Sequence, residues 1–349
     1  MTSPGSPPGE AGAVETAPPP RRGRVPPLAW VSLVVVYIAW GSTYVAIRVA
    51  VREVPPLTLA GMRYLVAGLI LWPFAVRSGG PSLRAEDRPG VKQWVAAGLV
   101  GILLLFGGNG GVTVGEQRVP AGLAALLVAT VPLWMAVGGR VLFGARVGVV
   151  TAVALAIGIV GVALVVRPAG GSRGDMLLVL GAAAVWGLGS VASPHLPLPR
   201  RVLVTSSIEM LVGGTTLLAV GAATGELGRL RPWNAATLWA MLFLIFGGSL
   251  LGFSAYAHVL SRLPLPLAST YAYVNPLVAV LLGWALLGET LTVADALGAA
   301  LILMSVVLVV AARTGSLPFS RRAATPRSRP SGGGPGKRAA PPASTSRTR

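Results

Sequence analysis

The sequence predicts an all-α integral membrane protein whose ten transmembrane helices form two inverted five-helix repeats. Three observations predict this fold class. The 349 residues are 53% hydrophobic and only 11% charged, the apolar residues fall into ten long runs, and the two halves of the chain resemble each other. A soluble domain normally has about a quarter of its residues charged. The runs lack the alternating polarity of β-barrel strands, so helices alone can satisfy the backbone in lipid.

A helix needs ~20 apolar residues to cross a bilayer. The first run is too long for a signal-peptide core and lacks a convincing small-residue cleavage site, so we expect it to be retained as the first helix. The connections between runs are short and leave no room for an inserted soluble domain. The expected helices cover residues 28–50, 56–76, 92–114, 119–142, 147–166, 175–193, 202–224, 236–258, 265–287 and 292–312.

The two ends of the chain differ from this apolar body. Residues 1–26 and 313–349 are rich in Pro, Gly, Ser, Ala and Arg, and such segments bury too little apolar surface to order themselves. We expect both to be disordered tails. Most Lys and Arg residues lie on the side that both tails share, which places both termini in the cytoplasm beneath the inner (plasma) membrane.

The net charge of +18 is best explained by this topology signal together with attraction to anionic lipid headgroups. The partners expected are therefore the lipid bilayer and a small-molecule solute, not nucleic acid. Oligomeric state is left open by the sequence.

Few residues here suit catalysis or metal binding. The chain has no cysteine, which excludes disulfides, thiolate metal sites and a thiol nucleophile. His195 and His258 are the only histidines, and both fall near the ends of spans without a carboxylate cluster. Glu116 and Glu289 lie at helix ends, where capping or loop roles are expected. We therefore expect no metal, no cofactor and no enzymatic activity.

The two halves of the chain form an internal repeat. When residues 118–145 are shifted by 144, nine of 28 positions are identical, and a shift of 146 pairs Trp40-Gly41 with Trp186-Gly187. The repeat is thus five spans long, covering 28–167 and 175–312. Because five is odd, the second copy must enter the membrane from the opposite side. Inverted repeats of this kind are the architecture of secondary transporters, which bind solute near the midplane between the copies.

Ionisable residues inside spans are costly, and each is a candidate site. Arg63 and Glu209 are related by the shift of 146 and lie ~10 Å deep in their helices. The inversion would place them toward opposite sides, so we expect two separate polar stations and not a direct ion pair. Arg63 either holds a substrate carboxylate or anchors backbone carbonyls. Glu209 binds a cation or a proton, or it is a satisfied hydrogen-bond acceptor.

The ninth span carries three polar residues shortly before a proline. Tyr271 and Asn275 are four residues apart and share a helix face, while Tyr273 is turned away. Pro276 frees the carbonyl of Ala272, so an unwound segment is expected here. Such a segment suits a midplane binding site.

Three further residues are candidates for the same cavity. Asn109 stands within the glycine-rich run 107–111, inside an apolar span where a phosphate-binding loop is excluded. We expect either a thinned or kinked helix there, with the amide facing a cavity, or simple close packing of the glycines. Trp40 and Tyr44 are one turn apart on the first span and either line the cavity or only pack.

Seven short motifs together resemble the EamA family of the drug/metabolite transporter superfamily, and are most similar to its YedA-type members. The resemblance covers about residues 30–312. The motifs are WGSTY at 40–44, GMR at 61–63, NGGVTVGE at 109–116, ATVPL at 129–133, IEML at 208–211, YAYVNPL at 271–277 and GET at 288–290.

This resemblance implies ten helices in two repeats and a central cavity that carries small metabolites across the inner membrane, often outward. One residue departs from the family pattern. Ala145 stands where the family usually has an acidic residue like Glu289, which puts the structural pairing at that end of the first copy in doubt.

The function expected is a secondary transporter, and an exporter, of small metabolites, amino-acid-like solutes or drugs by alternating access. The candidate substrate-binding residues are Trp40, Tyr44, Arg63, Asn109, Glu209, Tyr271 and Asn275. The alternative is a membrane binding or assembly subunit that does not transport.

Overall fold

The computed structural model describes residues 26–77, 89–145, 147–166, 173–263 and 265–313. The predicted tails 1–26 and 313–349 therefore lie outside the described residues, except for Pro26 and Arg313. Within the described ranges all regular secondary structure is helical, and each of the ten predicted spans contains a helix.

Eight helical segments are long and apolar enough to cross a membrane. Two more, α7 (Val149–Val165) and α13 (Tyr271–Leu287), are apolar but have only 17 residues each. The eight segments are α1 (Pro27–Ala50), α2 (Pro56–Arg77), Val91–Gly115, Ala121–Phe143, α8 (Arg173–Ala192) with the 3₁₀ turn η3 (Ser193–His195), α9 (Val202–Ala223), Ala235–Arg262 and α14 (Val293–Arg313).

Two of these spans widen in the middle into π-helix. Val91–Gly115 consists of α3 (Val91–Gly101), η2 (Ile102–Gly110) and α4 (Gly111–Gly115), and Ala235–Arg262 consists of α10 (Ala235–Leu242), η5 (Phe243–Leu251) and α11 (Gly252–Arg262). The glycine-rich run around Asn109 thus lies in a helix that is wider than normal and is not thinned. The alternative of close-packed glycines is supported, since a Cβ on Gly108 would lie 2.9 Å from Trp186 and one on Gly111 would lie 2.8 Å from Ala182. π segments are rare and often mark functional sites.

The predicted unwound segment at Pro276 is also wrong. Pro276 lies inside the continuous helix α13, since one proline removes only one helical hydrogen bond. The break lies nearly two turns before Pro276, at Ser269 and Thr270, between α12 (Leu265–Ala268) and α13. There the Thr270 hydroxyl donates to the Leu267 carbonyl at 2.6 Å. The equivalent span in the first half breaks between α5 (Ala121–Val128) and α6 (Val131–Phe143).

Helices α2 and α9 pack against each other in antiparallel orientation through glycines. A Cβ built on Gly68 would lie 3.0 Å from the Leu211 amide nitrogen, and one on Gly214 would lie 2.5 Å from the Leu65 nitrogen. The shift of 146 relates Gly68 to Gly214 and Leu65 to Leu211. The two contacts are therefore one contact made twice, with the halves exchanging roles.

A second pair of contacts repeats in the same way. A Cβ on Gly41 of α1 would lie 3.0 Å from the Asn275 carbonyl oxygen, and one on Gly187 of α8 would lie 3.1 Å from the Val131 carbonyl oxygen. Each half thus packs its first helix against the fourth helix of the other half. Small residues allow this close approach of backbones in lipid.

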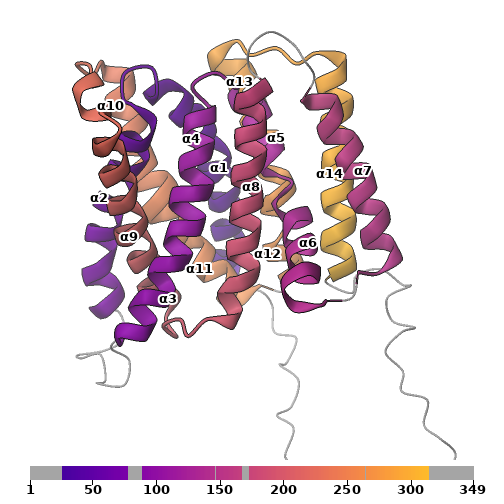
Figure 1. Cartoon of the computed structure of the whole chain (residues 1–349), viewed down its shortest axis with the longest axis horizontal. Coiled ribbons are helices and arrows are strands. Elements are labelled where there is room, and N and C mark those ends of the chain that lie inside the picture. Colours follow the sequence, from indigo (N-terminus) through magenta and orange to yellow (C-terminus); the bar gives the residue numbers. More distant parts are fainter. Residues whose placement is uncertain (1–25, 78–88, 146, 167–172, 264, 314–349) are drawn as a thin grey trace, which may run out of the picture.

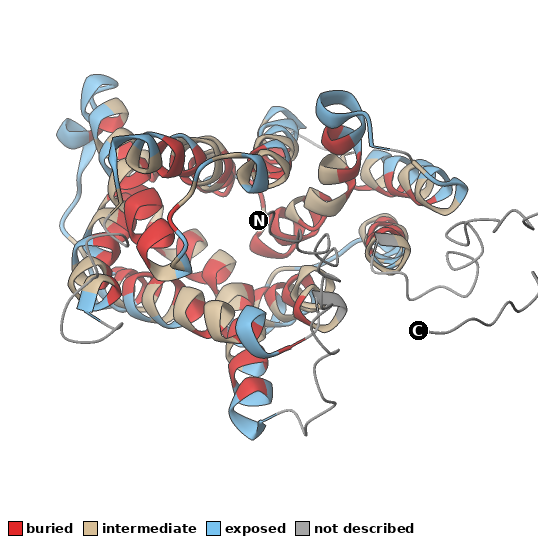
Figure 2. Ribbon diagram, turned by 90° about the horizontal axis from the view of Figure 1, so that it is seen from below, coloured by how far each residue is buried: buried red, intermediate tan, exposed pale blue. Residues whose placement is uncertain are grey.

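The described helices form a bundle with two distinct ends. In Figure 1, α8 and α9 are joined at the lower end, where α14 also ends. We call this the near end, and the opposite end, where α1 ends and α2 begins, the far end. Figure 2, seen from below, shows buried positions facing the interior and exposed positions on the outside. Helices α7 and α14 pack together at one side, and Gly161 meets the backbone of Gly298.

Carboxylates from the second half hold two helix N-termini of the first half at the far end. Glu289 accepts hydrogen bonds from the amides of Ala121 (2.7 Å) and Gly122 (3.0 Å) at the start of α5. Glu226 accepts from the Thr58 amide (2.8 Å) and the Thr58 hydroxyl (2.9 Å) at the start of α2. The capping role expected of Glu289 is confirmed, and the cap joins the two halves.

A third carboxylate at the far end belongs to the first half and caps a helix of the second half. Glu53 of the first half accepts from the Asn234 amide at 2.9 Å, at the start of α10 in the second half. This hydrogen bond lowers the pKa of the Glu53 carboxyl below its ordinary value and favours the ionised form. The shifts of 146 and 144 give Pro199 and Ala145 as the near-end counterparts of Glu53 and Glu289. Neither counterpart carries a carboxyl group.

The turn that carries Glu289 is nevertheless the same in both halves. Gly144 and Gly288 both end their helices in the left-handed region, at φ 63° and 66°, where glycine has no Cβ penalty. The amides of Ala145 and Glu289 then bond the carbonyls six residues back, at 3.0 and 3.1 Å. Only the acidic side chain has been lost from the first copy.

The packing of α2 on α9 generates a prediction. Gly214→Ala places a methyl group against the Leu65 backbone, which cannot move as a flexible side chain would, so we expect a loss of about 1–3 kcal/mol in stability. Thermal unfolding in detergent measures this loss. Gly181→Ala is the matched control, because a Cβ at Gly181 in α8 meets nothing within 4 Å. Equal stability of the two variants would show that this contact is not tight.

Candidate functional site

The two halves enclose a cavity of about 450 Å³. Its lining comes from every span except α7 and α14. At one end it includes Leu198 and Pro199, which lie in the connection between η3 and α9. The cavity thus reaches the near end of the bundle. At the far end the three carboxylate caps tie the helices together.

All seven residues that the sequence singled out line this one cavity. They come from five different spans and are far apart in the chain. They are Trp40 and Tyr44 of α1, Arg63 of α2, Asn109 of η2, Glu209 of α9, and Tyr271 and Asn275 of α13.

Arg63 is a buried cation whose hydrogen bonding is incomplete. Its side chain is 3% exposed, its Nε donates to the Ser249 hydroxyl at 2.9 Å, and its guanidinium lies 4.7 Å from the ring centre of Tyr64. Its Nη1 has no hydrogen-bond partner. Within the described ranges no carboxylate lies within 4 Å of it. Such a group is costly to bury unless an anion completes its contacts.

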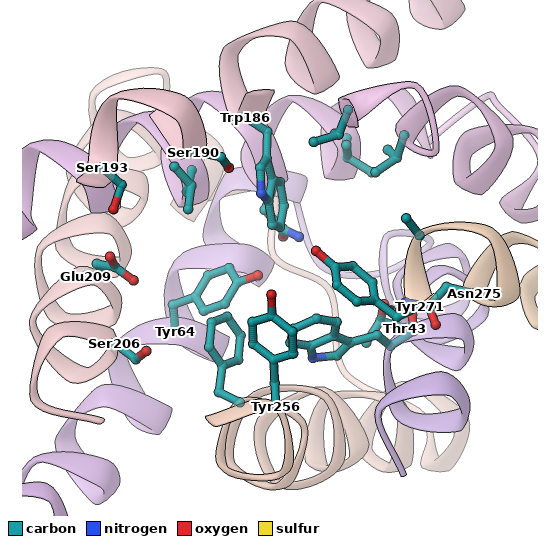
Figure 3. Close-up of a pocket in the computed structure, with 18 of the residues that line it drawn as sticks. Thr43, Tyr64, Trp186, Ser190, Ser193, Ser206, Glu209, Tyr256, Tyr271 and Asn275 are labelled. Atoms are coloured by element: carbon teal, nitrogen blue, oxygen red, sulfur yellow. Dashed lines mark hydrogen bonds between the residues drawn. The ribbon is translucent and has the colours of Figure 1, made fainter. Parts of the chain in front are cut away.

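Glu209 lies in the part of the cavity that is closer to the near end. It is the eighth residue of α9, counted from the near end, and Arg63 is the eighth residue of α2, counted from the far end. The described residues contain no ion pair between them, in agreement with the prediction of separate stations. Figure 3 shows the Glu209 carboxyl on the same side of the cavity as Ser193 and Ser206.

A cluster of aromatic rings lines another part of the cavity. The Trp40 ring contacts Phe253 and Tyr271 edge-on at 5.4 and 5.3 Å between centroids, and Tyr256 at 5.0 Å. The Trp40 indole donates to the Gly248 carbonyl of η5 at 3.1 Å. In Figure 3 the hydroxyls of Tyr64, Tyr256 and Tyr271 point toward the middle of the cavity.

Two amide side chains, those of Asn109 and Asn275, also belong to the polar lining. Asn275 is 8% exposed and its Oδ1 has no partner, while the backbone carbonyl of Asn109 accepts from Thr113 at 2.8 Å. Tyr271 and Asn275 share the cavity face as the helical spacing predicts. Tyr273 is absent from the lining and packs against an apolar cluster.

The sequence reasoning missed several lining residues, of which Trp186 and Ser190 of α8 had a detectable signal. The shift of 146 makes them the counterparts of Trp40 and Tyr44, so the repeat itself pointed to them. No comparable signal marked Tyr64, Phe253 or Tyr256. Their exposure to the cavity depends on how the spans rotate about their axes.

Comparison with known proteins gives consistent matches over most of the chain. The model of the EamA-like transporter family matches residues 28–167 and again residues 174–311. The "Uncharacterized inner membrane transporter YedA" of Escherichia coli (strain K12) is 39% identical over 282 residues, covering 80% of this chain and 89% of that protein.

More distant relatives extend the comparison. The "WAT1-related protein At3g02690, chloroplastic" of Arabidopsis thaliana is 26% identical, covering 81% of this chain and 69% of that protein. The "Probable amino-acid metabolite efflux pump" of Salmonella typhimurium (strain LT2) is 25% identical, covering 77% and 90%. One solved crystal structure, 19% identical, has a TM-score of 0.57 and covers 85% of this chain and 99% of that chain, which shows a shared fold.

The two matched repeats, the identity to YedA and the apolar helices lead to one conclusion. This chain is a multi-pass membrane protein and belongs to the EamA-like transporter family.

Proposed function

We propose that this protein is a secondary transporter that exports small amphipathic or amino-acid-like metabolites by alternating access through the central cavity. The observation that carries the proposal is a cavity between two repeats whose contacts exchange roles. Such a pair can rock about a central site and expose it to one side at a time. The name of the Salmonella relative, an amino-acid metabolite efflux pump, supports this class of solute.

The proposed architecture is ten spans in two inverted repeats, 28–167 and 175–312. The shorter helices α7 and α13 then cross as the fifth and ninth spans, since 17 residues extend ~25 Å. The antiparallel register of α2 and α9 supports the inversion, because the shift of 146 maps each contact onto its reverse. Both termini lie in the cytoplasm in this arrangement, so the near end faces inward.

The lining has the chemistry of a solute with two unlike ends. Arg63 offers an unpartnered Nη1 to an anionic group, and Glu209 offers a carboxylate to a cationic group. The aromatic rings of the lining suit an apolar body. These features support an amino acid or a compound built like one.

The far-end caps make the two ends of the transport path unequal. Glu289, Glu226 and Glu53 each hold a helix of the opposite half at the far end, whereas Ala145 and Pro199 hold none at the near end. A carboxylate at a helix N-terminus stabilises by about 0.5–2 kcal/mol. The caps therefore bias the resting protein toward the conformation with the far end closed.

Reconstitution tests the function directly. Proteoliposomes containing the full chain are expected to release a preloaded amino-acid mixture faster than empty liposomes, as followed by mass spectrometry of the external medium. Ser190→Trp fills the cavity and is expected to stop this release. Leu177→Trp on the same helix, at an exposed position outside the cavity, is the matched control. Release equal to that from empty liposomes would favour a non-transporting binding or assembly subunit.

Arg63 provides a test of the solute contact. Arg63→Gln removes the charged donor and is expected to reduce amino-acid transport about 10- to 100-fold, the equivalent of a charge-assisted hydrogen bond. Arg63→Lys keeps the charge and is expected to restore part of the rate. Membrane insertion is checked by quantifying folded protein. A full rate in Arg63→Gln would assign the residue to a structural role.

The difference in helix capping between the near end and the far end can be tested by adding the carboxyl group that residue 145 lacks. Ala145→Glu is expected to accept from the Leu265 amide, the counterpart of Ala121, and to shift the population toward the state with the near end closed. Pro266, the counterpart of Gly122, has no N–H to donate. The chain has no cysteine, so labelling of Ser193→Cys by a polar maleimide reports near-end access. Labelling should be slower in Ala145→Glu than in Ala145→Gln. Unchanged labelling would contradict the proposal that the carboxylate caps favour one conformation over the other.

A further inference from the structure

Glu116 is a buried carboxyl group that the transport site does not explain. It follows α4 at the far end, its side chain is 0% exposed, and neither carboxyl oxygen has a hydrogen-bond partner. As expected for a capping or loop residue, it ends α4 and its amide bonds the Val112 carbonyl, but its carboxyl group caps no helix. A buried carboxylate left in this state would cost several kcal/mol, whereas the neutral acid costs far less.

The neighbouring arginine contacts the backbone and not the acid. Arg48 of α1 donates from Nη1 to the carbonyl oxygens of Glu116 and Gln117, both at 2.6 Å. No nitrogen of Arg48 lies within 4 Å of the Glu116 carboxyl oxygens, since the described residues hold only the ion pair Arg118–Asp175. The cation is thus close by but is engaged elsewhere.

The charged and titratable groups that face Glu116 come from three directions. Arg48 and Tyr44 lie on α1, Arg63 on α2, and Glu289 in the turn after α13. Tyr44 and Arg63 line the solute cavity. Val112, also in the lining, lies one helical turn before Glu116. The carboxyl therefore stands just beyond the closed end of the cavity.

We propose that Glu116 is the proton-binding site of a proton-coupled transport cycle, protonated while the far end is closed and deprotonated when that end opens. This inference rests on the proposed function and adds the coupling ion to it. As the far end closes, the acid takes up a proton from water on the far side and releases Arg48. Before that end opens again, the proton passes through the cavity to water on the near side, and Arg48 turns from the two carbonyls to the carboxylate.

A proton fits this site better than a metal ion. A hard cation such as Ca²⁺ needs six to eight oxygen ligands, and the described residues contain no group of three acidic or histidine side chains. The guanidinium of Arg48 would also repel a bound metal ion. The same guanidinium favours the carboxylate once the two groups meet, which supplies the second state of a proton switch.

Glu226 is an internal comparison for Glu116. It is also buried, at 6% exposure, but it accepts from two backbone amides and one hydroxyl. Hydrogen bonds to the charged form favour ionisation. The two glutamates of one end should therefore differ in protonation at the same neutral pH.

Infrared difference spectroscopy of the full chain in proteoliposomes tests the protonation state without any solute. Subtracting the Glu116→Gln spectrum from the wild-type spectrum at neutral pH should leave the carbonyl band of a protonated carboxyl. The matched subtraction for Glu226→Gln should leave carboxylate bands. Carboxylate bands for Glu116 would overturn the proposal.

Transport under a pH gradient tests the coupling. Wild-type release of the amino-acid mixture should rise severalfold when the side that the far end faces is made acidic relative to the other, in the sense of proton–solute exchange. In Glu116→Gln the rate should no longer respond to the gradient. A response kept in Glu116→Gln, or lost only in Glu209→Gln, would overturn the proposal. Solute release at equal pH tests the proposed function separately.

Discussion

Close approach of helix backbones at glycine is the constraint on which this structure depends. In lipid the apolar side chains gain little by leaving one hydrocarbon environment for another, so helix association depends on packing and hydrogen bonds. The glycines at 68 and 214 bring α2 and α9 together, and those at 41 and 187 bring each first helix against the opposite fourth helix. Because each contact occurs twice with roles exchanged, the helices that remain apart enclose a cavity between the halves.

The two halves differ at the turn that follows the fourth helix of each. The turn at Gly144 repeats the turn at Gly288 in φ and in backbone hydrogen bonds, yet only the second copy carries the glutamate. A perfectly symmetric pair would have no preferred side. Losing a single carboxyl removes one helix cap at the near end and leaves its partner at the far end. The backbone of the turn is thus kept while the two ends of the bundle differ in capping.

Much of this arrangement could be predicted from sequence, because lipid imposes simple rules. Run length located the helices, and the shifts of 144 and 146 anticipated which contacts would repeat. Charge inside apolar spans pointed to Arg63 and Glu209, and the helical spacing placed Tyr271 beside Asn275. These inferences depend only on chain order and helix geometry, which is why they reached all seven candidate residues in one cavity.

The failures have an equally physical origin. Both π segments contain a pair of adjacent glycines, and glycine content alone does not separate a π segment from a kink. Pro276 was expected to break its helix, but the interruption moved to Thr270, whose hydroxyl can bond a carbonyl in the preceding turn. Glu116 was expected to cap a helix or lie in a loop, and it does end α4, but the burial of its carboxyl group without a hydrogen-bond partner was not foreseen. Its isolation depends on Arg48 from a distant helix, which local sequence does not reveal.

The separation of Arg63 from Glu209 bears on how binding and movement are linked. Had the two charges met, each would have offset the burial cost of the other, and the empty cavity would have been electrostatically satisfied. Kept apart on antiparallel helices, Arg63 and Glu209 do not compensate each other, so under the proposed function a solute with two unlike ends would bridge them. A ligand shifts a conformational equilibrium only by the difference in its affinity for the two states. Because the two stations belong to opposite halves, the proposed rocking would change the distance between them and with it the affinity for a bridging solute.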